Sequence, residues 1–291
     1  MLIATNGILI SQKGDVLLIQ RNDTRTFAPP GGSLEAGELP TDGVAREVRE
    51  ETGLIVMPVR LAALSFLPIK PQPYFAFSFR CLMRGGEIQP SPESPHVGFY
   101  PYDNLPRPMA PMHRRRIETA VTHTGGPIVW QTDKLNWYDR LGHFVLNNVV
   151  YRYYAWQRQR GKGPAYQPPP AWQITVHTVT QNPQGEVLWL DEGSGQWRLP
   201  GGPADDATPP WETAVSLTPL PLQLTNLTGV YVTENAAKMT LVFTAVTTQT
   251  VLPNPARWFP PDQLPQTTPS QTQYLQDALS PSEITLFRRR Q

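Results

Sequence analysis

The chain of 291 residues contains two segments that repeat the same sequence signals in the same order, and this repetition limits its fold more than any other feature. In each segment a glycine turn precedes an apolar run, a Pro-Gly-Gly triplet follows, and a motif ending in Leu-Pro comes later. The paired segments are Gly14–Leu17 and Gly185–Leu188, Pro30–Gly32 and Pro200–Gly202, and Val97–Pro106 and Ala256–Pro265. Such repetition predicts tandem copies of one domain of roughly 120 residues.

We therefore expect an N-terminal domain at residues 1–125, a connecting region at 126–171 and a C-terminal domain at 172–291. Apolar residues recur at helical spacing from Asp133 to about Gln159, which predicts one long or broken helix with Asp133 as its N-cap. Its many aromatic residues are compatible with base stacking or with packing between domains or subunits. Packing is favoured, because both faces carry aromatics and no basic stripe accompanies them.

Composition excludes several classes of protein. With 25 Lys and Arg against 24 Asp and Glu, the formal net charge is +1, which gives no general electrostatic case for binding nucleic acid or an anionic membrane. No apolar run approaches the roughly 18 residues of a membrane helix, and the N-terminus lacks the basic start of a signal peptide. Cys81 is the single cysteine, so no internal disulfide is possible. We expect a cytoplasmic protein with Cys81 as buried filler.

The first copy alternates between strand and helix patterns. Val16–Gln20 is a β run, "LIVMPVRLAALSFLP" and "YFAFSFRCLM" predict two longer strands, and "MHRRRIETAVTH" predicts a closing helix. Between them, Thr41–Glu51 has the pattern of a helix with Asp42 in its first turn. Mixed strands with helices on either side predict an α/β sandwich.

Three glutamates gather at the end of this predicted helix. Glu47, Glu50 and Glu51 stand at i, i+3 and i+4, so a helix places all three on one face, where like charges repel. A solvated helix face explains such a pattern, and so does a site for a multivalent cation. Carboxylate oxygens suit Mg²⁺ or Mn²⁺, and the glycines before the helix allow a backbone carbonyl to join them.

The wider pattern decides between these interpretations. From Gly32 the sequence is G-x5-E-x7-R-E-V-R-E-E-T-G-L, and it resembles the box of the Nudix hydrolase family. The fixed positions are Gly32, Glu38, Arg46, Glu47, Glu50, Glu51 and Gly53, with apolar Val48 and Leu54. The resemblance implies a mixed sheet sandwiched between helices, with the box as loop, helix and loop. It also implies Mg²⁺-dependent hydrolysis of a diphosphate that links a nucleoside to another moiety.

The same resemblance implies a role for each residue of the box. Glu47, Glu50 and Glu51 would hold the metal ions, with the Gly31 carbonyl as a further ligand. Gly32, Glu38, Arg46 and Gly53 would brace the box, and Glu35 and Asp42 would be surface and capping residues. The general base would be Glu47 or Glu50, or else Glu93 in the loop "SPESPHVGFY", where His96 is the alternative.

Two basic features outside the box each have a functional and a plainer interpretation. Arg21 ends the second strand, where family members often place a cation against the substrate phosphate, and an ordinary charge at a strand end explains it equally well. The run His113–Arg116 would attract phosphate, but its place in the closing helix favours a solvated face.

The second copy lacks the residues that carry the chemistry. Aligned from Gly202, it has Thr208 for Glu38, Ser216 for Arg46, Leu217 for Glu47, Leu220 for Glu50 and Pro221 for Glu51. Asp205 and Asp206 remain, and we expect them to cap a short helix rather than bind metal. We interpret this copy as a degenerate Nudix-like domain that replaces the partner subunit of a dimeric enzyme. The protein would then be a monomeric pseudo-dimer or a homodimer.

These features favour a hydrolase of a nucleoside diphosphate derivative, such as ADP-ribose, a nucleotide sugar or a dinucleotide. The alternative is a non-catalytic nucleotide sensor or scaffold protein, which would generally lose box residues or add a DNA-binding domain. A nucleoside triphosphate pyrophosphohydrolase shares the box and is a third option. The box defines metal and phosphate chemistry, whereas loops outside it define the substrate.

Overall fold

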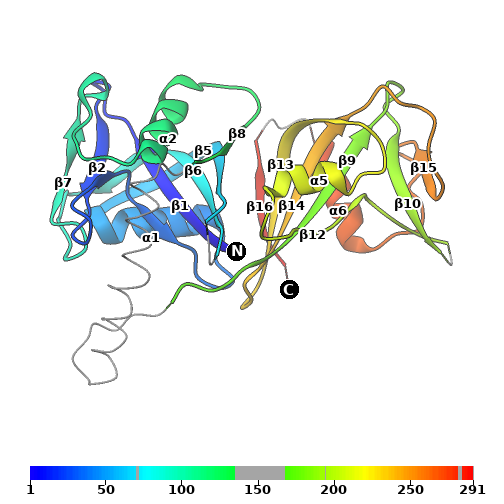
Figure 1. Cartoon of the computed structure of the whole chain (residues 1–291), viewed down its shortest axis with the longest axis horizontal. Coiled ribbons are helices and arrows are strands. Elements are labelled where there is room, and N and C mark those ends of the chain that lie inside the picture. The colour runs from blue at the N-terminus through cyan, green and yellow to red at the C-terminus, as the bar shows by residue number, and fades with distance from the viewer. Residues whose placement is uncertain (70–71, 135–167, 194, 281–283, 291) are drawn as a thin grey trace.

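The computed structural model describes residues 1–69, 72–134, 168–193, 195–280 and 284–290. These residues form an N-terminal part, residues 1–134, and a C-terminal part, residues 168–290, which lie side by side (Figure 1). Both parts are built from mixed β-sheets and helices, so the expected α/β fold is confirmed. The expected linker helix lies outside the described residues beyond Lys134.

The N-terminal part contains a five-stranded mixed sheet in the order β4-β1-β6-β5-β8 and a three-stranded sheet in the order β3-β2-β7. Helix α1 contacts β1, β4 and β5, and helix α2 contacts β5 and β6. The elements are β1 (Leu2–Leu9), β2 (Val16–Gln20), β3 (Phe27–Ala28), β4 (Gly31–Ser33), α1 (Pro40–Thr52), β5 (Leu54–Leu67), β6 (Tyr74–Gly86), β7 (His96–Tyr100), the 3-10 helix η1 (Tyr102–Asn104), α2 (Pro111–Thr122) and β8 (Val129–Thr132).

The C-terminal part contains one sheet of eight strands. Its main path runs β11-β10-β9-β14-β13-β16, while β12 pairs with β9 and β15 pairs with β10. The elements are β9 (Gln173–Gln181), β10 (Val187–Gly193), β11 (Gln196–Arg198), β12 (Gly201–Pro203), α5 (Pro210–Ser216), β13 (Gln223–Thr233), β14 (Lys238–Val246), β15 (Ala256–Phe259), α6 (Pro269–Ala278) and β16 (Leu286–Arg290).

Each strand pairing of the N-terminal part has a counterpart in the C-terminal part with the same direction. The antiparallel pairs β1–β4, β5–β6, β2–β3 and β2–β7 correspond to β9–β12, β13–β14, β10–β11 and β10–β15. The parallel pairs β1–β6 and β5–β8 correspond to β9–β14 and β13–β16. Even the isolated bridge Ile10–Val16 recurs as Gln181–Val187, which joins β9 to β10. The two parts therefore share one topology.

Helix α1 carries the box, and its ends follow from local sequence. Pro40 lies in the first turn, where its missing N–H costs no helical hydrogen bond. Val44 and Val48 are fully buried on one side of the helix. Gly53 ends the helix in the left-handed region at φ 75°, and a Cβ there would lie 2.5 Å from the Glu87 carbonyl oxygen. Glycine is therefore required at the position that the box specifies.

The expected capping roles of three aspartates are wrong. Leu39 is the N-cap of α1 and makes no side-chain cap, while Asp42 in the first turn binds Arg289 instead. Asp205 Oδ1 accepts hydrogen bonds from the backbone N–H groups of residues 207 and 208, in a turn that precedes α5. Asp206 binds the N-terminal amine of Met1 at 3.2 Å. Both α1 and α5 begin with proline, which removes one of the backbone N–H groups that a cap would satisfy.

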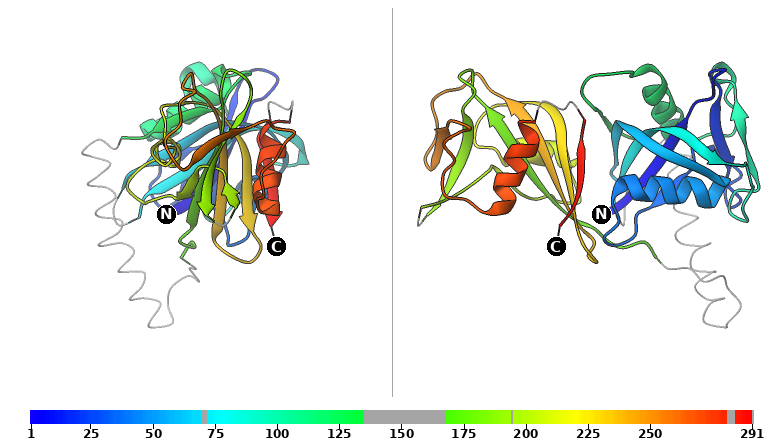
Figure 2. Two further views of the ribbon diagram at one scale, coloured as in Figure 1. Left: turned by 90° about the vertical axis from the view of Figure 1, so that its right-hand side faces the viewer. Right: turned by 180° about the vertical axis from the view of Figure 1, so that it is seen from behind.

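The two parts share one hydrophobic core across their boundary, where β16 lies in the front view of Figure 1 and in the rear view of Figure 2. Phe79 of β6 packs against Phe287 of β16 with ring centroids 5.5 Å apart, and Phe243 of β14 packs against Trp130 of β8 at 5.7 Å. Phe79 and Phe243 occupy equivalent register positions, opposite Leu61 and Leu227, as do Trp130 and Phe287, opposite Leu64 and Val230. The contact is isologous, as between the subunits of a two-fold dimer.

Two further expectations concern Cys81 and membranes. Cys81 is 1 % exposed, and burial raises the pKa of its thiol to about 12, so it is an inert core residue as expected. Among the described residues, no helix combines the length and hydrophobicity that crossing a bilayer requires.

Candidate active site

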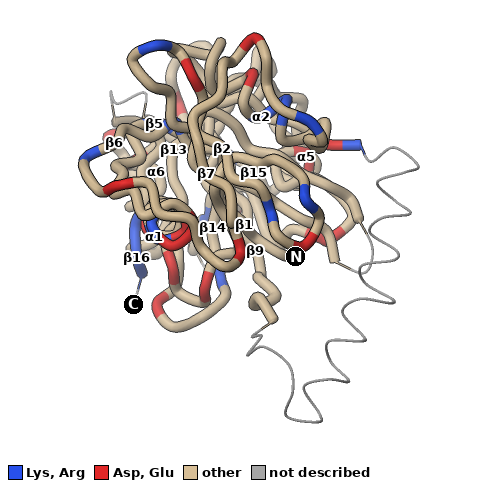
Figure 3. The backbone as a smooth tube through the Cα atoms, turned by 90° about the vertical axis from the view of Figure 1, so that its left-hand side faces the viewer, with Lys and Arg blue, Asp and Glu red and all other residues tan. Residues whose placement is uncertain are grey.

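Arg46 is the centre of the polar cluster on α1, where acidic segments gather (Figure 3). Its guanidinium binds the carboxylate of Glu38 with two hydrogen bonds, Nε to Oε1 at 2.8 Å and Nη2 to Oε2 at 2.9 Å. Nη2 also donates to the Ser33 carbonyl at 3.1 Å. The fork of Arg46 thus fixes the loop before α1 to the helix, in the geometry that only arginine provides.

The same guanidinium reaches two of the three glutamates. Arg46 Nη1 donates to Glu47 Oε1 at 2.9 Å and to Glu50 Oε2 at 3.1 Å. Glu47 is largely buried, whereas the side chain of Glu50 is 59 % exposed. One arginine therefore sets the positions of both carboxylates.

The third glutamate is fixed by the glycine loop. Glu51 Oε2 accepts the backbone N–H of Gly31 at 2.8 Å, and Glu51 is 9 % exposed. Gly31 adopts φ 150°, and a Cβ there would lie 2.2 Å from the Thr5 carbonyl oxygen. At Gly32 a Cβ would lie 2.5 Å from Glu47 Oε1. Both glycines are needed for backbone to approach the carboxylates closely.

Burial makes negative charge unfavourable at two of these carboxylates. It raises the pKa of Glu51 to about 8, opposed by the Gly31 hydrogen bond and reinforced by Glu47. Burial also raises the pKa of Glu47, while Arg46 opposes this rise.

The donor set fits a hard divalent cation. Glu47, Glu50 and Glu51 present carboxylate oxygens from one turn of α1, and Gly31 and Gly32 leave room beside them. Within the described ranges, no three acidic, histidine or cysteine side chains stand close enough to ligate one ion as placed. Arg46 engages Glu47 and Glu50, and the Gly31 N–H engages Glu51, so a cation would compete with these partners.

The loop that was expected to supply a base lies next to Glu51. Ser94 Oγ donates to Glu51 Oε1 at 3.5 Å, and the Glu93 carbonyl accepts the N–H of Asn22 at 2.9 Å. The charge of Glu93 makes a small contribution to the raised pKa of Glu51. The side chains of Glu93 and His96 are both exposed. Ser94 was missed from the sequence, since a serine in a loop carries no motif.

Arg21 also lies near the carboxylates. Its guanidinium binds Asp23 through Nε at 2.9 Å and Nη2 at 2.6 Å, and this hydrogen bonding raises the pKa of Arg21. Its charge in turn lowers the pKa of Glu51. Arg21 therefore contributes positive charge beside the glutamates, and its contact with substrate phosphate stays a prediction.

A buried polar cluster lies between α2 and the end of β8, and it corrects one expectation. The run His113–Arg116 is only partly a solvated face: Arg115 is exposed, whereas Arg116 is 1 % exposed and binds the equally buried Asp133 at 3.1 Å. The guanidinium of Arg116 lies 5.9 Å from the ring centre of Tyr74, and burial lowers the pKa of His113 to about 3. Asp133 lies outside the run His113–Arg116, so the local sequence could not indicate that Arg116 is buried beside it.

The equivalent place in the C-terminal part keeps the glycines and lacks the acids. Gly201 adopts φ 147°, and a Cβ there would lie 2.0 Å from the Val176 carbonyl oxygen, which repeats the geometry of Gly31. Arg198 Nη1 donates to the Gly201 carbonyl at 2.9 Å. Leu217 lies beside Gly202, where an added Cβ would be 3.4 Å from the leucine side chain. Arg198 thus contacts the carbonyl of Gly201, and the equivalent carbonyl of Gly31 is the one expected to ligate metal in the N-terminal part.

Comparison with known proteins decides the family. A family model described as the NUDIX domain matches residues 2–120. A MutT-like protein of Streptomyces ambofaciens is 34% identical over 123 residues, which cover 42% of this chain and 79% of that protein. The chain belongs to the Nudix family of hydrolases. The glutamate and arginine cluster on α1 is therefore the Nudix box of a family member.

Two further relatives are named for an activity. An ADP-ribose pyrophosphatase of Methanocaldococcus jannaschii is 32% identical over 129 residues, which cover 43% of this chain and 75% of that protein. A putative ADP-ribose pyrophosphatase of Bacillus subtilis is 30% identical over 107 residues, which cover 35% of this chain. These residues span about half of the Bacillus protein, 51% of its length.

Proposed function

We propose that this Nudix protein hydrolyses the diphosphate bond of a nucleoside diphosphate linked to another moiety, with a divalent cation bound at Glu47, Glu50 and Glu51. The observation that carries the proposal is the position of Arg46, which binds Glu38, Glu47 and Glu50 together. The approach of Gly31 to Glu51 supports it further. A solvated helix face needs neither a bidentate brace nor a buried glutamate.

Mg²⁺ is the proposed ion, with Mn²⁺ as a substitute, and the Gly31 carbonyl is a proposed further ligand. When bound, such an ion polarises a phosphoryl oxygen and lowers the pKa of a coordinated water. Glu38 and Arg46 keep the carboxylates in place, while Gly32 and Gly53 permit the close backbone contacts. The hydrogen bonds of Arg46 and the close contacts of the two glycines support these proposed roles.

Two residues outside the helix complete the proposed site. Arg21 is proposed to balance negative charge on the substrate phosphates, and the effect of its charge on the pKa of Glu51 supports this role. The general base is Glu47 or Glu50 within the box, or Glu93 from the adjacent loop. Glu93 is exposed and precedes Ser94, which contacts Glu51, and this supports its candidacy.

The names of the relatives support the substrate class. Two of them are named ADP-ribose pyrophosphatases, so ADP-ribose is the first compound to test, followed by nucleotide sugars and dinucleotides. A nucleoside triphosphate is a competing substrate with the same box. A nucleotide sensor without turnover is the non-enzymatic alternative, and the complete box argues against it.

We propose further that the two parts are tandem copies, with domains at 1–125 and 172–291 joined by residues 126–171. The start of this joining segment includes β8, which pairs with β5 in the N-terminal sheet. The repeated strand pairings and the isologous contact support this division and a pseudo-dimer within one chain. The expected binding partner of the protein is its substrate, a nucleoside diphosphate derivative. A cytoplasmic location stays a prediction.

One experiment tests the activity. The full chain is incubated with Mg²⁺ and a panel of ADP-ribose, nucleotide sugars, dinucleotides and nucleoside triphosphates, beside the variant Glu50→Gln. We expect turnover of a nucleoside diphosphate derivative and a loss of about 100-fold or more in the variant. Arg49→Gln, an exposed change on the same helix, is the matched control. Turnover that survives Glu50→Gln would refute the site, and no turnover of any compound would favour a sensor.

A further inference from the structure

We propose that the C-terminal part positions the metal site of the N-terminal part, by holding the box loop Glu35–Glu38 through the β13–β14 turn and the start of α1 through Arg289. The inference rests on the proposed function of α1, and it gives the C-terminal part a role that needs no chemistry of its own. Gly37, Arg289 and Asp42 are positioning residues in this scheme, since none of them is proposed to touch metal or substrate.

The first contact joins backbone to backbone. The Gly37 N–H donates to the carbonyl of Ala236, in the β13–β14 turn, at 3.1 Å. Gly37 adopts φ 78°, and a Cβ there would lie 2.6 Å from the backbone nitrogen of Asn235. Because backbone atoms cannot rotate away as side chains do, any residue other than glycine would push the turn and the box loop apart.

The second contact joins β16 to the start of α1. Arg289 Nη2 binds Asp42 Oδ2 at 2.6 Å, and both side chains are about half exposed, at 50% and 49%. Asp42 lies in the first turn of α1, one turn before Arg46. An exposed ion pair contributes little stability, so its effect is expected on position rather than on folding.

The held loop connects directly to the carboxylates. Glu38 follows Gly37, and its carboxylate also accepts the N–H of Glu35 at 2.9 Å. Glu38 binds Arg46 bidentately, and Arg46 in turn binds Glu47 and Glu50. A shift of the loop therefore moves Glu38, and the arginine that sets both glutamates moves with it.

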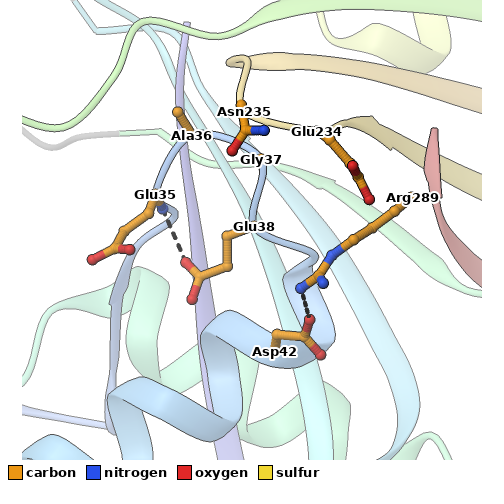
Figure 4. Close-up of a pocket in the computed structure, with 8 residues that line it drawn as sticks. All are labelled: Glu35, Ala36, Gly37, Glu38, Asp42, Glu234, Asn235 and Arg289. Atoms are coloured by element: carbon orange, nitrogen blue, oxygen red, sulfur yellow. Dashed lines mark hydrogen bonds and ion pairs between the residues drawn. The ribbon is translucent and has the colours of Figure 1, made fainter. Parts of the chain in front are cut away.

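A hollow of about 360 Å³ surrounds these contacts at the boundary between the two parts (Figure 4). It is lined by Glu35, Ala36, Gly37, Glu38 and Asp42 on one side, and by Glu234, Asn235 and Arg289 on the other. In Figure 4 Asn235 lies over Gly37, and the Arg289 side chain extends across the hollow to Asp42. A loop bordered by a hollow lacks close packing there, so the contacts from the C-terminal part add to the support that Arg46 gives through Glu38.

The test compares full-length variants whose controls match them in geometry. Gly37→Ala is compared with Gly14→Ala, which has similar backbone strain at φ 88° but no atom within 4 Å of the added Cβ. Arg289→Ala is compared with Arg288→Ala, which removes an ion pair with Asp277 inside the C-terminal part. Arg289→Lys keeps the charge and should restore the wild-type behaviour.

Two readouts separate positioning from folding: the Mn²⁺ dissociation constant, from electron paramagnetic resonance of free Mn²⁺, and the Mg²⁺ concentration for half-maximal turnover. We expect Gly37→Ala to weaken both about tenfold or more, and Arg289→Ala to weaken both roughly two- to fivefold. Both controls should match the wild type, and melting of Arg289→Ala should be unchanged.

The outcomes distinguish this inference from the proposed function. A wild-type chain that turns over substrate, with Gly37→Ala and Arg289→Ala unchanged in Mn²⁺ binding and Mg²⁺ dependence, overturns the inference alone. A wild-type chain without turnover overturns the proposed function, and Mn²⁺ binding to the same variants still tests the positioning role. Equal losses in the variants and their controls would also overturn the inference, because they would indicate general destabilisation.

Discussion

Phe79 and Phe287, which are separated by more than two hundred positions in the sequence, pack together at the boundary of the two parts with ring centroids 5.5 Å apart. Their counterparts Phe243 and Trp130 make the reciprocal contact at 5.7 Å. In an isologous interface, each partner contributes the same patch, and both halves of the contact are then equivalent. The boundary between the two parts thus has the form of a dimer interface within one chain.

The first prediction concerns this boundary. Phe287→Ala removes a partly buried ring that also contacts Phe77, and we expect a loss of about 2–3 kcal/mol in the free energy of unfolding. A double-mutant cycle with Phe79→Ala should give a coupling of about 0.5–1.5 kcal/mol, measured by urea unfolding. Val251→Ala, at a side chain that is 77% exposed, is the control and should change stability by less than about 0.5 kcal/mol. A coupling of zero would contradict the contact.

The second prediction separates two adjacent glycines. Gly31→Ala should prevent stable folding, because its Cβ meets the Thr5 carbonyl at 2.2 Å in a backbone conformation that disfavours side chains. Gly32→Ala should cost about 1 kcal/mol or less, since its Cβ meets the end of the Glu47 side chain, which can move away.

That movement should nevertheless weaken Mn²⁺ binding by Gly32→Ala about tenfold or more, measured by titration with paramagnetic resonance detection. Gly202→Ala is the matched control at the equivalent position of the C-terminal part. Its Cβ would meet Leu217 at 3.4 Å, an ordinary contact, so Mn²⁺ binding should not change. Unchanged Mn²⁺ binding by Gly32→Ala would show that Glu47 is not a ligand.

Local pattern predicted the elements and the box residues, because these depend on neighbours in the sequence. The helix expected at Thr41–Glu51 is observed at Pro40–Thr52, and the strand at Val16–Gln20 has its expected bounds. The capping roles of Asp42, Asp205 and Asp206 were wrong, since each aspartate found a partner outside the start of its helix.

What the sequence could not predict depends on contacts between distant segments. The burial of Arg116 requires Asp133 from the end of β8 and the packing of α2 on the sheet. The approach of Arg289 to Asp42 joins segments from the two parts of the chain, so no spacing rule reveals it. Runs of charged residues are usually exposed, but a single charged residue can be buried when it pairs with an opposite charge from a distant segment.

The third prediction concerns the brace of the box. Arg46→Lys keeps the charge but loses the fork that binds Glu38 twice and the Ser33 carbonyl once. We expect a loss of about 1.5–3 kcal/mol in the free energy of unfolding, together with weaker Mn²⁺ binding. Arg49→Lys, on the exposed side of the same helix, should change neither quantity. Equal behaviour of the two variants would show that the fork has no special role.

The fourth prediction concerns acid stability. His177 is 9 % exposed and pairs with Gly201, as Asn6 pairs with Gly31 in the N-terminal part. Burial, with a contribution from Arg198, lowers the pKa of His177 to about 4. At this residue the unfolded chain, with a pKa of about 6.5, binds more protons than the folded chain between pH 6.5 and 4, so the contribution of His177 to stability falls as the pH falls through this window. His177→Asn, which copies the counterpart residue, should flatten the fall by up to about 1.4 kcal/mol per pH unit. Urea unfolding of both proteins from pH 7 to 4 measures the difference. Parallel curves would contradict a neutral buried His177. A residual slope common to both proteins is expected from His113, whose pKa is lowered to about 3 by burial, and from Glu51, whose raised pKa of about 8 gives a slope of opposite sign.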